Sequence, residues 1–317
     1  MSVLTVGETM ALLDPLGEGE LAHGRLLTLR LAGAESNFAV GLARLGIRVR
    51  WISRLGADLL GDMIFDTLAD EEIDLRYVAR DPAAPTGVFL KWRSGVGTQV
   101  AYYRRDSAAS RLGRADVPDE ALAGVRLVHL TGITLALSDS AAELVRDLAR
   151  RAHEHGAQIV FDPNWRPALW GSPAEAAAAQ SDVLPFVDWY LCGEEEGRVV
   201  FGTPDPASTL AAACAAGASA AVVRVGVRGA IVRDSSGITT EVPSVREVTV
   251  LDEIGAGDAF AAGFAFGLLQ GWRPPDCARI GNVLAAFALE GTGDWETLPR
   301  LTDIVDHLRP ELRSAAS

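Results

Sequence analysis

Residues 251–260 read LDEIGAGDAF, and this short stretch predicts a strand-to-helix junction with an anion site. An apolar run from Val245 to Leu251 precedes the glycines, and small and apolar residues from Ala259 to Leu269 follow them. Glycines at such a junction let backbone N–H groups approach an anion, and the helix N-terminus favours negative charge. Asp258 falls in the first helical turn, where a carboxylate beside a phosphate can accept a proton from an attacking hydroxyl. From these residues alone, a simple helix cap explains Asp258 equally well.

The bulk properties of the chain are those of an acidic globular protein. Of its 317 residues, 49% are hydrophobic and 22% are charged, which is ordinary for a protein with one large core. The net charge of −13 argues against nucleic acid and against an anionic membrane surface as partners. Lys91 is the only lysine, so arginines, backbone N–H groups or a metal ion must neutralise any bound phosphate.

The cysteines and the first residues of the chain indicate an intracellular protein. Cys192, Cys214 and Cys277 are widely spaced and form no C-x-x-C pair, so they suggest neither a disulfide scaffold nor a zinc site. The chain starts with a strand-like pattern and lacks a basic segment followed by a cleavage site, so no signal peptide is expected. It contains no run of about 18 apolar residues that could span a membrane. We therefore expect a cytoplasmic protein with no membrane partner.

The order of the predicted elements indicates an α/β fold. From Leu127 onward, short apolar runs alternate with helical patterns, which predicts a parallel sheet covered by helices on both faces. The candidate motifs fall at strand ends, where such sheets bind their ligands. Residues 9–32 and 84–106 interrupt the alternation with short β segments and predict a small β appendage. With no internal repeat and no long linker, we expect residues 1–317 to form a single α/β domain.

The GAGD sequence of residues 255–258 resembles the signature of the ribokinase-like (PfkB) carbohydrate kinases. The resemblance implies a three-layer fold with a mostly parallel central sheet, and a lid built from the β appendage. It implies that Asp258 is the catalytic base. It assigns the anion hole for the transferred phosphoryl group to Gly255, Ala256 and Gly257. In that family the lid often also forms a dimer interface, so a homo-oligomer through the lid is expected.

Further segments are similar to the branch of that family that phosphorylates 2-keto-3-deoxygluconate: residues 33–37, 102–111, 162–166 and 293–294. Arg104 and Arg166 suit the carboxylate of a sugar acid, because guanidinium groups bind carboxylates through paired, charge-assisted hydrogen bonds. For each arginine a surface ion pair is the alternative. Tyr102 and Tyr103 alternate along a strand, so only one can face the sugar and the other packs in the lid. The implied substrate contacts are Gly33, Ala34, Glu35, Asn37, Phe89, Tyr102, Tyr103, Arg104, Ile133, Arg166, Asp258 and Asp294.

The nucleotide site is implied by the same resemblance. The sequence has no G-x-x-x-x-G-K-[ST], so it is not a P-loop kinase, and no G-x-G-x-x-G follows its first strand. Residues 226–229 read GVRG after a predicted strand, and they form either a loop beside the ATP phosphates or a tight turn. The implied cofactor contacts are Asn164, Gly193, Glu196, Arg224, Gly226, Arg228, Gly229, Gly255, Gly257 and Asn282. Glu196 is expected to hold Mg²⁺ through water, and a monovalent cation is the third expected cofactor.

The sequence therefore predicts an ATP-dependent, Mg²⁺-assisted kinase of a sugar acid, with 2-keto-3-deoxygluconate as the substrate. A kinase of a neutral ketose, such as a fructokinase, or of a nucleoside is one alternative. A sugar-binding protein that keeps the fold without the reaction is the other. Three residues depart from the pattern of the family: Phe89 replaces a Tyr, Gly193 replaces an Asn, and Glu253 replaces a Thr.

Overall fold

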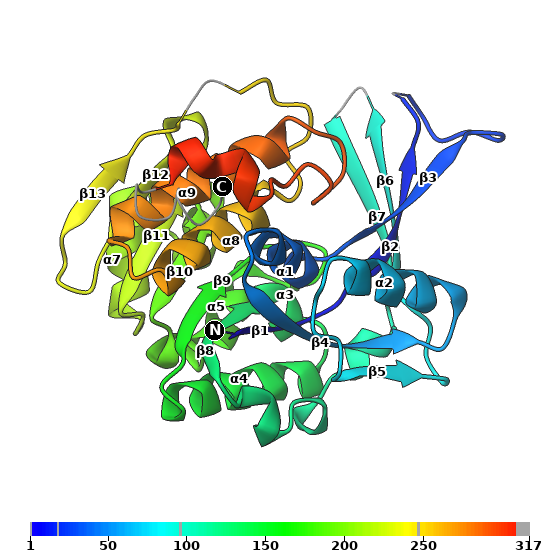
Figure 1. The fold of residues 1–317 in the computed structure, drawn as a ribbon, viewed down its shortest axis with the longest axis horizontal. Helices are drawn as coiled ribbons and strands as arrows, with labels where there is room; N and C mark the ends of the chain where they lie inside the picture. The colour runs from blue at the N-terminus through cyan, green and yellow to red at the C-terminus, as the bar shows by residue number, and fades with distance from the viewer. Residues whose placement is uncertain (1, 18, 95–96, 246–247, 309–317) are drawn as a thin grey trace.

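Two β-sheets organise the chain in the computed structural model, which describes residues 2–17, 19–94, 97–245 and 248–308 (Figure 1). The larger sheet has the strand order β13-β12-β11-β10-β9-β8-β1-β4-β5, and the smaller sheet has the order β3-β2-β6-β7. Helices cover both faces of the larger sheet, which makes three layers. This is the predicted α/β architecture.

The strands of the larger sheet pair in parallel from β5 to β11, and the pairs β11–β12 and β12–β13 at one edge are antiparallel. The central strands β1, β8, β9, β10 and β11 are mainly apolar, because helices bury both faces of the sheet. The strands are β1 (Ser2–Val6), β4 (Arg48–Gly56), β5 (Val78–Asp81), β8 (Val125–Thr131), β9 (Gln158–Asp162), β10 (Trp189–Gly193), β11 (Ala220–Arg224), β12 (Ala230–Arg233) and β13 (Thr239–Val242).

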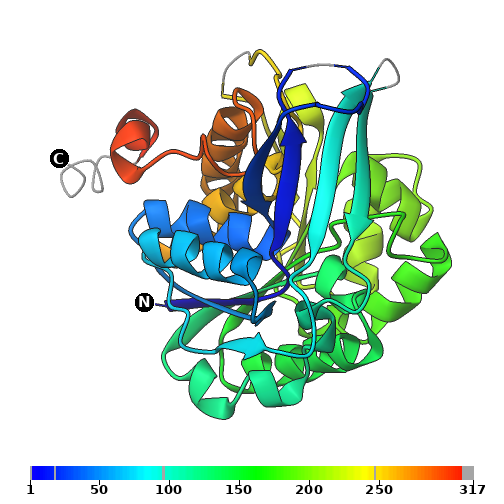
Figure 2. The same ribbon diagram turned by 90° about the vertical axis from the view of Figure 1, so that its right-hand side faces the viewer.

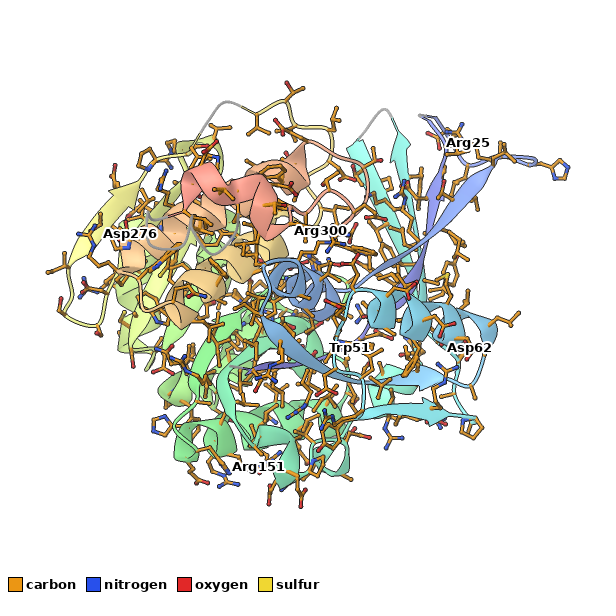
Figure 3. All side chains as sticks on the ribbon, viewed as in Figure 1. Arg25, Trp51, Asp62, Arg151, Asp276 and Arg300 are labelled. Atoms are coloured by element: carbon orange, nitrogen blue, oxygen red, sulfur yellow. The ribbon has the colours of Figure 1, made fainter. Side chains whose placement is uncertain are left out.

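Each face of this sheet has its own hydrophobic core. One core packs the sheet against α1 (Ala34–Arg44), α2 (Leu59–Asp70), α8 (Ala256–Leu269) and α9 (Pro274–Leu289). The other packs it against α3 (Gly132–Leu135), α4 (Asp139–Glu154), α5 (Pro173–Ser181), α6 (Glu194–Phe201) and α7 (Pro206–Ala215). The fully buried Trp51 lies well inside the molecule, whereas Asp62 and Asp276 lie toward opposite edges of the view (Figure 3).

Glycines let α8 and α9 pack closely against each other. A Cβ atom on Gly263 would lie 2.6 Å from the Ile280 carbonyl oxygen, and one on Gly267 would lie 2.8 Å from Cα of Cys277. Because such contacts are too short for a side chain, only glycine allows this approach. The close packing fixes the position of α8, and with it the position of its first turn.

The smaller sheet stands beside the carboxyl ends of the parallel strands (Figures 1 and 2). It contains β2 (Met10–Pro15), β3 (Leu27–Ala32), β6 (Val88–Ser94) and β7 (Gly97–Tyr103). The pair β2–β6 is parallel and the other two pairs are antiparallel. The prediction that residues 9–32 and 84–106 contain strands outside the main sheet is confirmed, while their role as a lid stays a prediction.

Some elements differ from the sequence-based expectations. The described residues of the apolar run before the glycines, Val245 and 248–251, lie in no strand. Instead, the backbone N–H groups of Leu251 and Asp252 donate to the carbonyl of Leu289, so this segment is a loop fixed by α9. The structure also contains β5, α3 and α5, which the hydrophobic pattern did not indicate. Residues Leu301–His307 form a 3₁₀ segment near the C-terminus.

Candidate active site

A large cavity of about 2230 Å³ lies between the smaller sheet and the carboxyl ends of the parallel strands. Almost every site residue predicted from the sequence lines it, although these residues come from segments far apart in the chain. The lining includes Gly33, Ala34, Asn37, Phe89, Tyr102, Arg104, Ile133, Asn164, Arg166, Gly193, Glu196, Arg224, Gly226, Arg228, Gly229, Gly255, Ala256, Gly257, Asp258, Asn282 and Asp294. Only Glu35 and Tyr103 of the predicted set are absent from this lining.

The carboxylate of Asp258 is held by two side-chain amides in the wall of the cavity. Asn37 Nδ2 donates to its Oδ2 at 2.8 Å, and Asn164 Nδ2 donates to its Oδ1 at 2.9 Å. Asn164 has a left-handed backbone with φ of 39°, which asparagine tolerates better than most residues. Its N–H donates to Asp162 Oδ1 at 2.8 Å, which fixes that backbone turn at the end of β9. The orientation of Asp258 is therefore set by residues of α1 and of the segment that follows β9.

The protonation of Asp258 is tuned to neutral pH. Burial is the main cause that raises the pKa of its carboxyl, from 3.8 to about 7, against the opposing effects of the Asn37 hydrogen bond and the Arg166 charge. A general base works best when its pKa lies near the operating pH. Asp258 can thus be ionised and still have appreciable affinity for a proton.

The turn that enters α8 has the geometry of an anion site. Gly255 is the N-cap and has a left-handed backbone with φ of 82°. A Cβ atom there would lie 2.1 Å from the Asp294 carbonyl oxygen, so the position requires glycine on two grounds. Because Gly255 has no side chain to cap the helix, the N–H groups of the first turn are left for a ligand.

Arg104 is held in the site by a carboxylate that the sequence did not reveal. Its Nε donates to Glu8 Oε2 at 2.7 Å, and Ser107 Oγ donates to Glu8 Oε1 at 2.5 Å. Glu8 is 1% exposed and Arg104 is 8% exposed, so this is a buried ion pair at the end of β1. Much of the charge of Arg104 is therefore already compensated before any ligand binds.

Arg166 is the better candidate for binding an anion. It donates a hydrogen bond to the carbonyl of Trp165 at 3.2 Å, and it forms no ion pair within the part of the chain that the structure describes. It acts through its charge on Asp258 and Asp294, lowering the pKa of both carboxyls. For Asp294 burial has the larger effect and raises the pKa to about 6. A half-buried and uncompensated guanidinium in a cavity wall attracts a carboxylate or phosphate.

The other end of the cavity has a phosphate-sized turn and an apolar wall. Arg224 donates to Asp162 at 2.7 Å and to Glu196 at 2.9 Å, and it also lies against Gly257. Gly226 and Gly229 have positive φ angles of 59° and 99°, so residues 226–229 form a turn that exposes backbone. The apolar wall consists of Val227, Val248, Val250, Leu251, Ala285, Ala286 and Leu289.

Two predicted contacts do not line the cavity. Glu35 is fully buried beneath the cavity, where Thr131 and Thr134 donate to its Oε1 at 2.5 and 2.6 Å. Tyr103 is 67% exposed and points to the opposite side of β7 from Tyr102, because side chains alternate along a strand. Tyr102 is the tyrosine that lines the cavity, and the rule that only one of the pair can do so holds.

The fit of Mg²⁺ and of a nucleotide can be judged from the donor groups. Both oxygens of Glu196 already accept hydrogen bonds, from Trp165 N–H and from Gly193 N–H and Arg224. The described residues contain no group of three or more His, Cys, Asp or Glu side chains that could hold a metal. Mg²⁺ usually keeps several waters and binds mainly to the phosphates of a nucleotide. Both oxygens of Glu196 are thus engaged within the protein, which suits Mg²⁺ held mainly by nucleotide phosphates and water rather than by direct protein ligands.

Comparison with known sequences identifies related proteins over nearly the whole chain. The family model described as pfkB family carbohydrate kinase matches residues 1–301. The chain is 35% identical over 303 residues to a 2-dehydro-3-deoxygluconokinase of Bacillus subtilis, covering 94% of this chain and 93% of the relative. It is 33% identical over 303 residues to a 2-dehydro-3-deoxygluconokinase of Thermoproteus tenax, covering 94% and 91%. Among the described residues, no helix has the length and apolar character needed to cross a membrane.

Solved structures agree with these matches. A PfkB protein from Polaromonas sp. JS666 superposes with a TM-score of 0.87 at 35% identity, covering 96% of this chain and 98% of that one. An uncharacterized sugar kinase from Pyrococcus horikoshii, solved in complex with ATP, superposes with a TM-score of 0.84 at 26% identity, covering 98% and 99%. The predicted fold class is confirmed by these similarities.

Proposed function

The chain belongs to the pfkB family of carbohydrate kinases, and from this premise we propose that it phosphorylates 2-keto-3-deoxygluconate (2-dehydro-3-deoxygluconate) at its terminal hydroxyl, with ATP as donor. One observation carries the proposal: the carboxylate of Asp258 and the uncompensated guanidinium of Arg166 line the same cavity. A sugar acid carries a hydroxyl to be activated and a carboxylate to be bound, so it matches both groups. The similarity to two 2-dehydro-3-deoxygluconokinases supports the same substrate.

The proposed reaction is an in-line phosphoryl transfer. The terminal hydroxyl oxygen forms a bond to the γ-phosphorus while the bond from that phosphorus to the β,γ-bridging oxygen of ATP breaks. Asp258 accepts the hydroxyl proton, and ADP leaves with the bridging oxygen. N–H groups around Gly255, Ala256 and Gly257 stabilise the negative charge on the transferred group.

The remaining protein groups bind and orient the reactants. Asn37 and Asn164 hold the Asp258 carboxylate, and both line the cavity. ATP lies with its base along the apolar wall and its phosphates between residues 226–229 and the first turn of α8. Bound Mg²⁺ neutralises phosphate charge, with Glu196 as its contact through water. Asn282 lines the base end, although its amide nitrogen already donates to the carbonyls of Val242 and Pro243. The dependence on a monovalent cation stays a prediction.

The smaller sheet serves two purposes in this proposal. Its inner face carries Met10, Leu12 and Phe89 against Tyr102, which excludes water from the sugar end of the cavity. Its outer face carries Leu27 and Leu29, which are 42% and 47% exposed. Exposed leucines on a sheet face suit a second copy of the chain, so we propose a homo-oligomer formed through this face.

A neutral ketose is the second candidate substrate, because Glu8 compensates the charge of Arg104. A coupled assay of ADP release decides between the two. With ATP and Mg²⁺, we expect kcat/KM for 2-keto-3-deoxygluconate to exceed that for fructose and for adenosine by at least about a hundredfold, the range that a charged hydrogen-bonding pair provides. A higher kcat/KM for fructose would assign the chain to neutral sugars. ADP release with none of the acceptors would favour a sugar-binding protein without kinase activity.

A further inference from the structure

Lys91, the only lysine of the chain, has a buried ammonium group. It lies on β6 two residues after Phe89, so both side chains point to the same side of the smaller sheet. The residue is 2% exposed, whereas lysine side chains normally keep their charged end in water. Its Nζ lies 2.5 Å from Oδ2 of Asp252 and 3.8 Å from Oδ1 of Asp294. The position of this charge therefore needs an explanation.

Both partners of Lys91 belong to the cavity wall. Asp252 and Asp294 line the cavity, and Lys91 lies behind them. Asp252 and Asp294 are each 5% exposed. Two carboxylates that are this close and this buried repel each other unless a cation lies between them. Lys91 is that cation, and it also lowers the pKa of Asp294 against the effect of burial.

The two carboxylates are connected to the backbone of the anion-hole turn. Asp252 Oδ1 accepts from the N–H of Ile254 at 3.2 Å, immediately before Gly255. Gly255 in turn packs against the backbone carbonyl of Asp294, since a Cβ atom there would lie 2.1 Å from that oxygen. A shift of either aspartate is thus transmitted to the turn that enters α8 and presents Asp258.

The smaller sheet contacts the same region at two other points. Trp295 Nε1 donates to the carbonyl of Leu31 at 3.1 Å, and Arg30 donates to Glu296 at 2.9 Å. Both contacts join β3 to residues 295 and 296, next to Asp294. Lys91 differs from them, because it comes from β6 and is bonded to residues of the cavity wall itself.

We propose that Lys91 is a positioning residue for phosphoryl transfer: its ammonium group ties β6 to Asp252 and Asp294, and so holds the anion-hole turn in its productive geometry when the smaller sheet lies over the cavity. This inference rests on the proposed kinase function. It predicts that the turn is correctly formed only when the smaller sheet is in place, which makes transfer depend on the covered state of the cavity. When the cavity is uncovered and water can enter it, the anion-hole turn is therefore not in its productive geometry.

Lys91→Met tests the role of the charge, because it keeps the stem of the side chain and removes the ammonium. We expect kcat to fall about a hundredfold, the typical effect of a displacement of about 1 Å in a reacting geometry. KM for ATP should change less than about threefold, since residues 226–229 and the apolar wall remain intact. Lys91→Arg keeps the charge and should retain more activity than Lys91→Met.

Chemical rescue separates positioning from folding. Lys91→Ala leaves space for a small cation, so added methylammonium or ethylammonium should raise its kcat at least about tenfold. The same amines should leave Lys91→Met unchanged, because the methionine fills the space. If Lys91→Met is too unstable to study, the double variant Lys91→Met with Asp252→Asn also removes a buried negative charge that Lys91 neutralises, and its kcat should still be low. A wild-type kcat in folded Lys91→Met, or in the folded double variant, would overturn the proposal. The proposal would also be overturned if the loss of kcat equalled the fraction of unfolded protein and the amines did not restore activity to Lys91→Ala.

Arg30→Met is the matched control, because Arg30 also links the smaller sheet to the segment after Asp294. Its kcat should stay within about threefold of the wild type, as partly exposed ion pairs contribute little. An equal loss in Arg30→Met would show that any link to this sheet is needed and would refute a specific role of Lys91. All variants are assayed with the acceptor that the wild type uses fastest. Failure of the sugar acid as acceptor therefore counts against the proposed substrate alone.

Discussion

At the scale of single residues, Asp258 is in an environment that disfavours its own charge. Its carboxyl is buried, and the Asn37 hydrogen bond and the Arg166 charge offset only part of the cost of ionisation. The protein keeps a costly carboxylate at the start of α8, where a helix cap alone would need no such pKa. Because Gly255 and not Asp258 is the N-cap of α8, this environment favours the general-base interpretation over the helix-cap interpretation that the sequence left open.

The pH dependence of stability follows from the raised pKa of Asp258. In the folded protein this pKa is about 7 against a reference value of 3.8. Protonated Asp258 therefore contributes to the free energy of unfolding below about pH 4, and this contribution is lost as the pH rises through 7 and the buried carboxyl ionises. The neutral side chain of Asp258→Asn does not ionise, so the variant avoids this loss of stability. We expect the variant to be more stable than the wild type by roughly 1–3 kcal/mol at pH 8 and similar at pH 4.5. Urea unfolding at both pH values measures it, and a destabilised variant at pH 8 would contradict the buried-charge interpretation.

The two arginines of the cavity should behave differently when each is replaced by alanine. Arg166→Ala removes an uncompensated charge, so we expect kcat/KM for the sugar acid to fall by about a hundredfold at unchanged stability. Arg104→Ala leaves Glu8 buried and unpaired, so it should destabilise the fold by about 3–5 kcal/mol. Steady-state kinetics with the acid and with fructose, beside thermal unfolding, measure both effects. Equal losses for fructose and the acid in Arg166→Ala would disprove the carboxylate contact.

At the scale of elements, the site depends on how α8 begins. The close packing of α8 on α9 and the loop held by Leu289 bring the first turn of α8 to the strand ends. The left-handed backbone of Gly255 then directs the N–H groups of that turn into the cavity. The helix start is thus positioned by packing rather than by a preceding strand.

Two glycines with similar backbone angles separate the effect of crowding at the start of α8 from the cost of a left-handed backbone. Gly255 and Gly46 have similar φ angles of 82° and 79°, but a Cβ atom on Gly46 would meet no atom within 4 Å. Gly46→Ala should therefore cost only the backbone strain, about 1 kcal/mol. Gly255→Ala must also displace Asp294, so we expect a larger loss of stability and a kcat lowered at least about a hundredfold. Melting curves and ADP release for both variants provide the comparison, and equal effects would refute the crowding at Gly255.

At the scale of the whole molecule, the outer face of the smaller sheet is the surface that best suits a second copy. Leu13, Leu29 and Leu90 lie opposite one another on adjacent strands of this face. We predict that the wild type is a dimer at micromolar concentration in light-scattering chromatography, and that Leu29→Glu makes it monomeric. Ile238→Glu, at an exposed position between β12 and β13, is the control and should leave the dimer intact. A monomeric wild type would remove this face from consideration.

The fold could be predicted because apolar runs mark most of the parallel strands, and such sheets bind their ligands at one edge. Most residues of the cavity wall, Asn164 and Arg224 among them, were instead implied by the resemblance to the pfkB family. Glu35 does not line the cavity, and a carboxyl one residue from a cavity-lining alanine gives no local sign of being buried against Thr131 and Thr134. The helix α5 has an alanine-rich sequence with little amphipathic pattern, and the loop at 248–254 depends on a distant carbonyl. Glu8 and Lys91 gained their roles only from long-range pairing.

The central claim is that Asp258 accepts the proton of the sugar hydroxyl beside the anion-hole turn. Its most direct test is single-turnover phosphoryl transfer by Asp258→Asn at pH 8, with binding of 2-keto-3-deoxygluconate measured separately by calorimetry. The account predicts a transfer rate lower than that of the wild type by on the order of a hundredfold or more, with the sugar acid bound nearly as tightly. A transfer rate close to that of the wild type, with the variant folded and saturated, would contradict it.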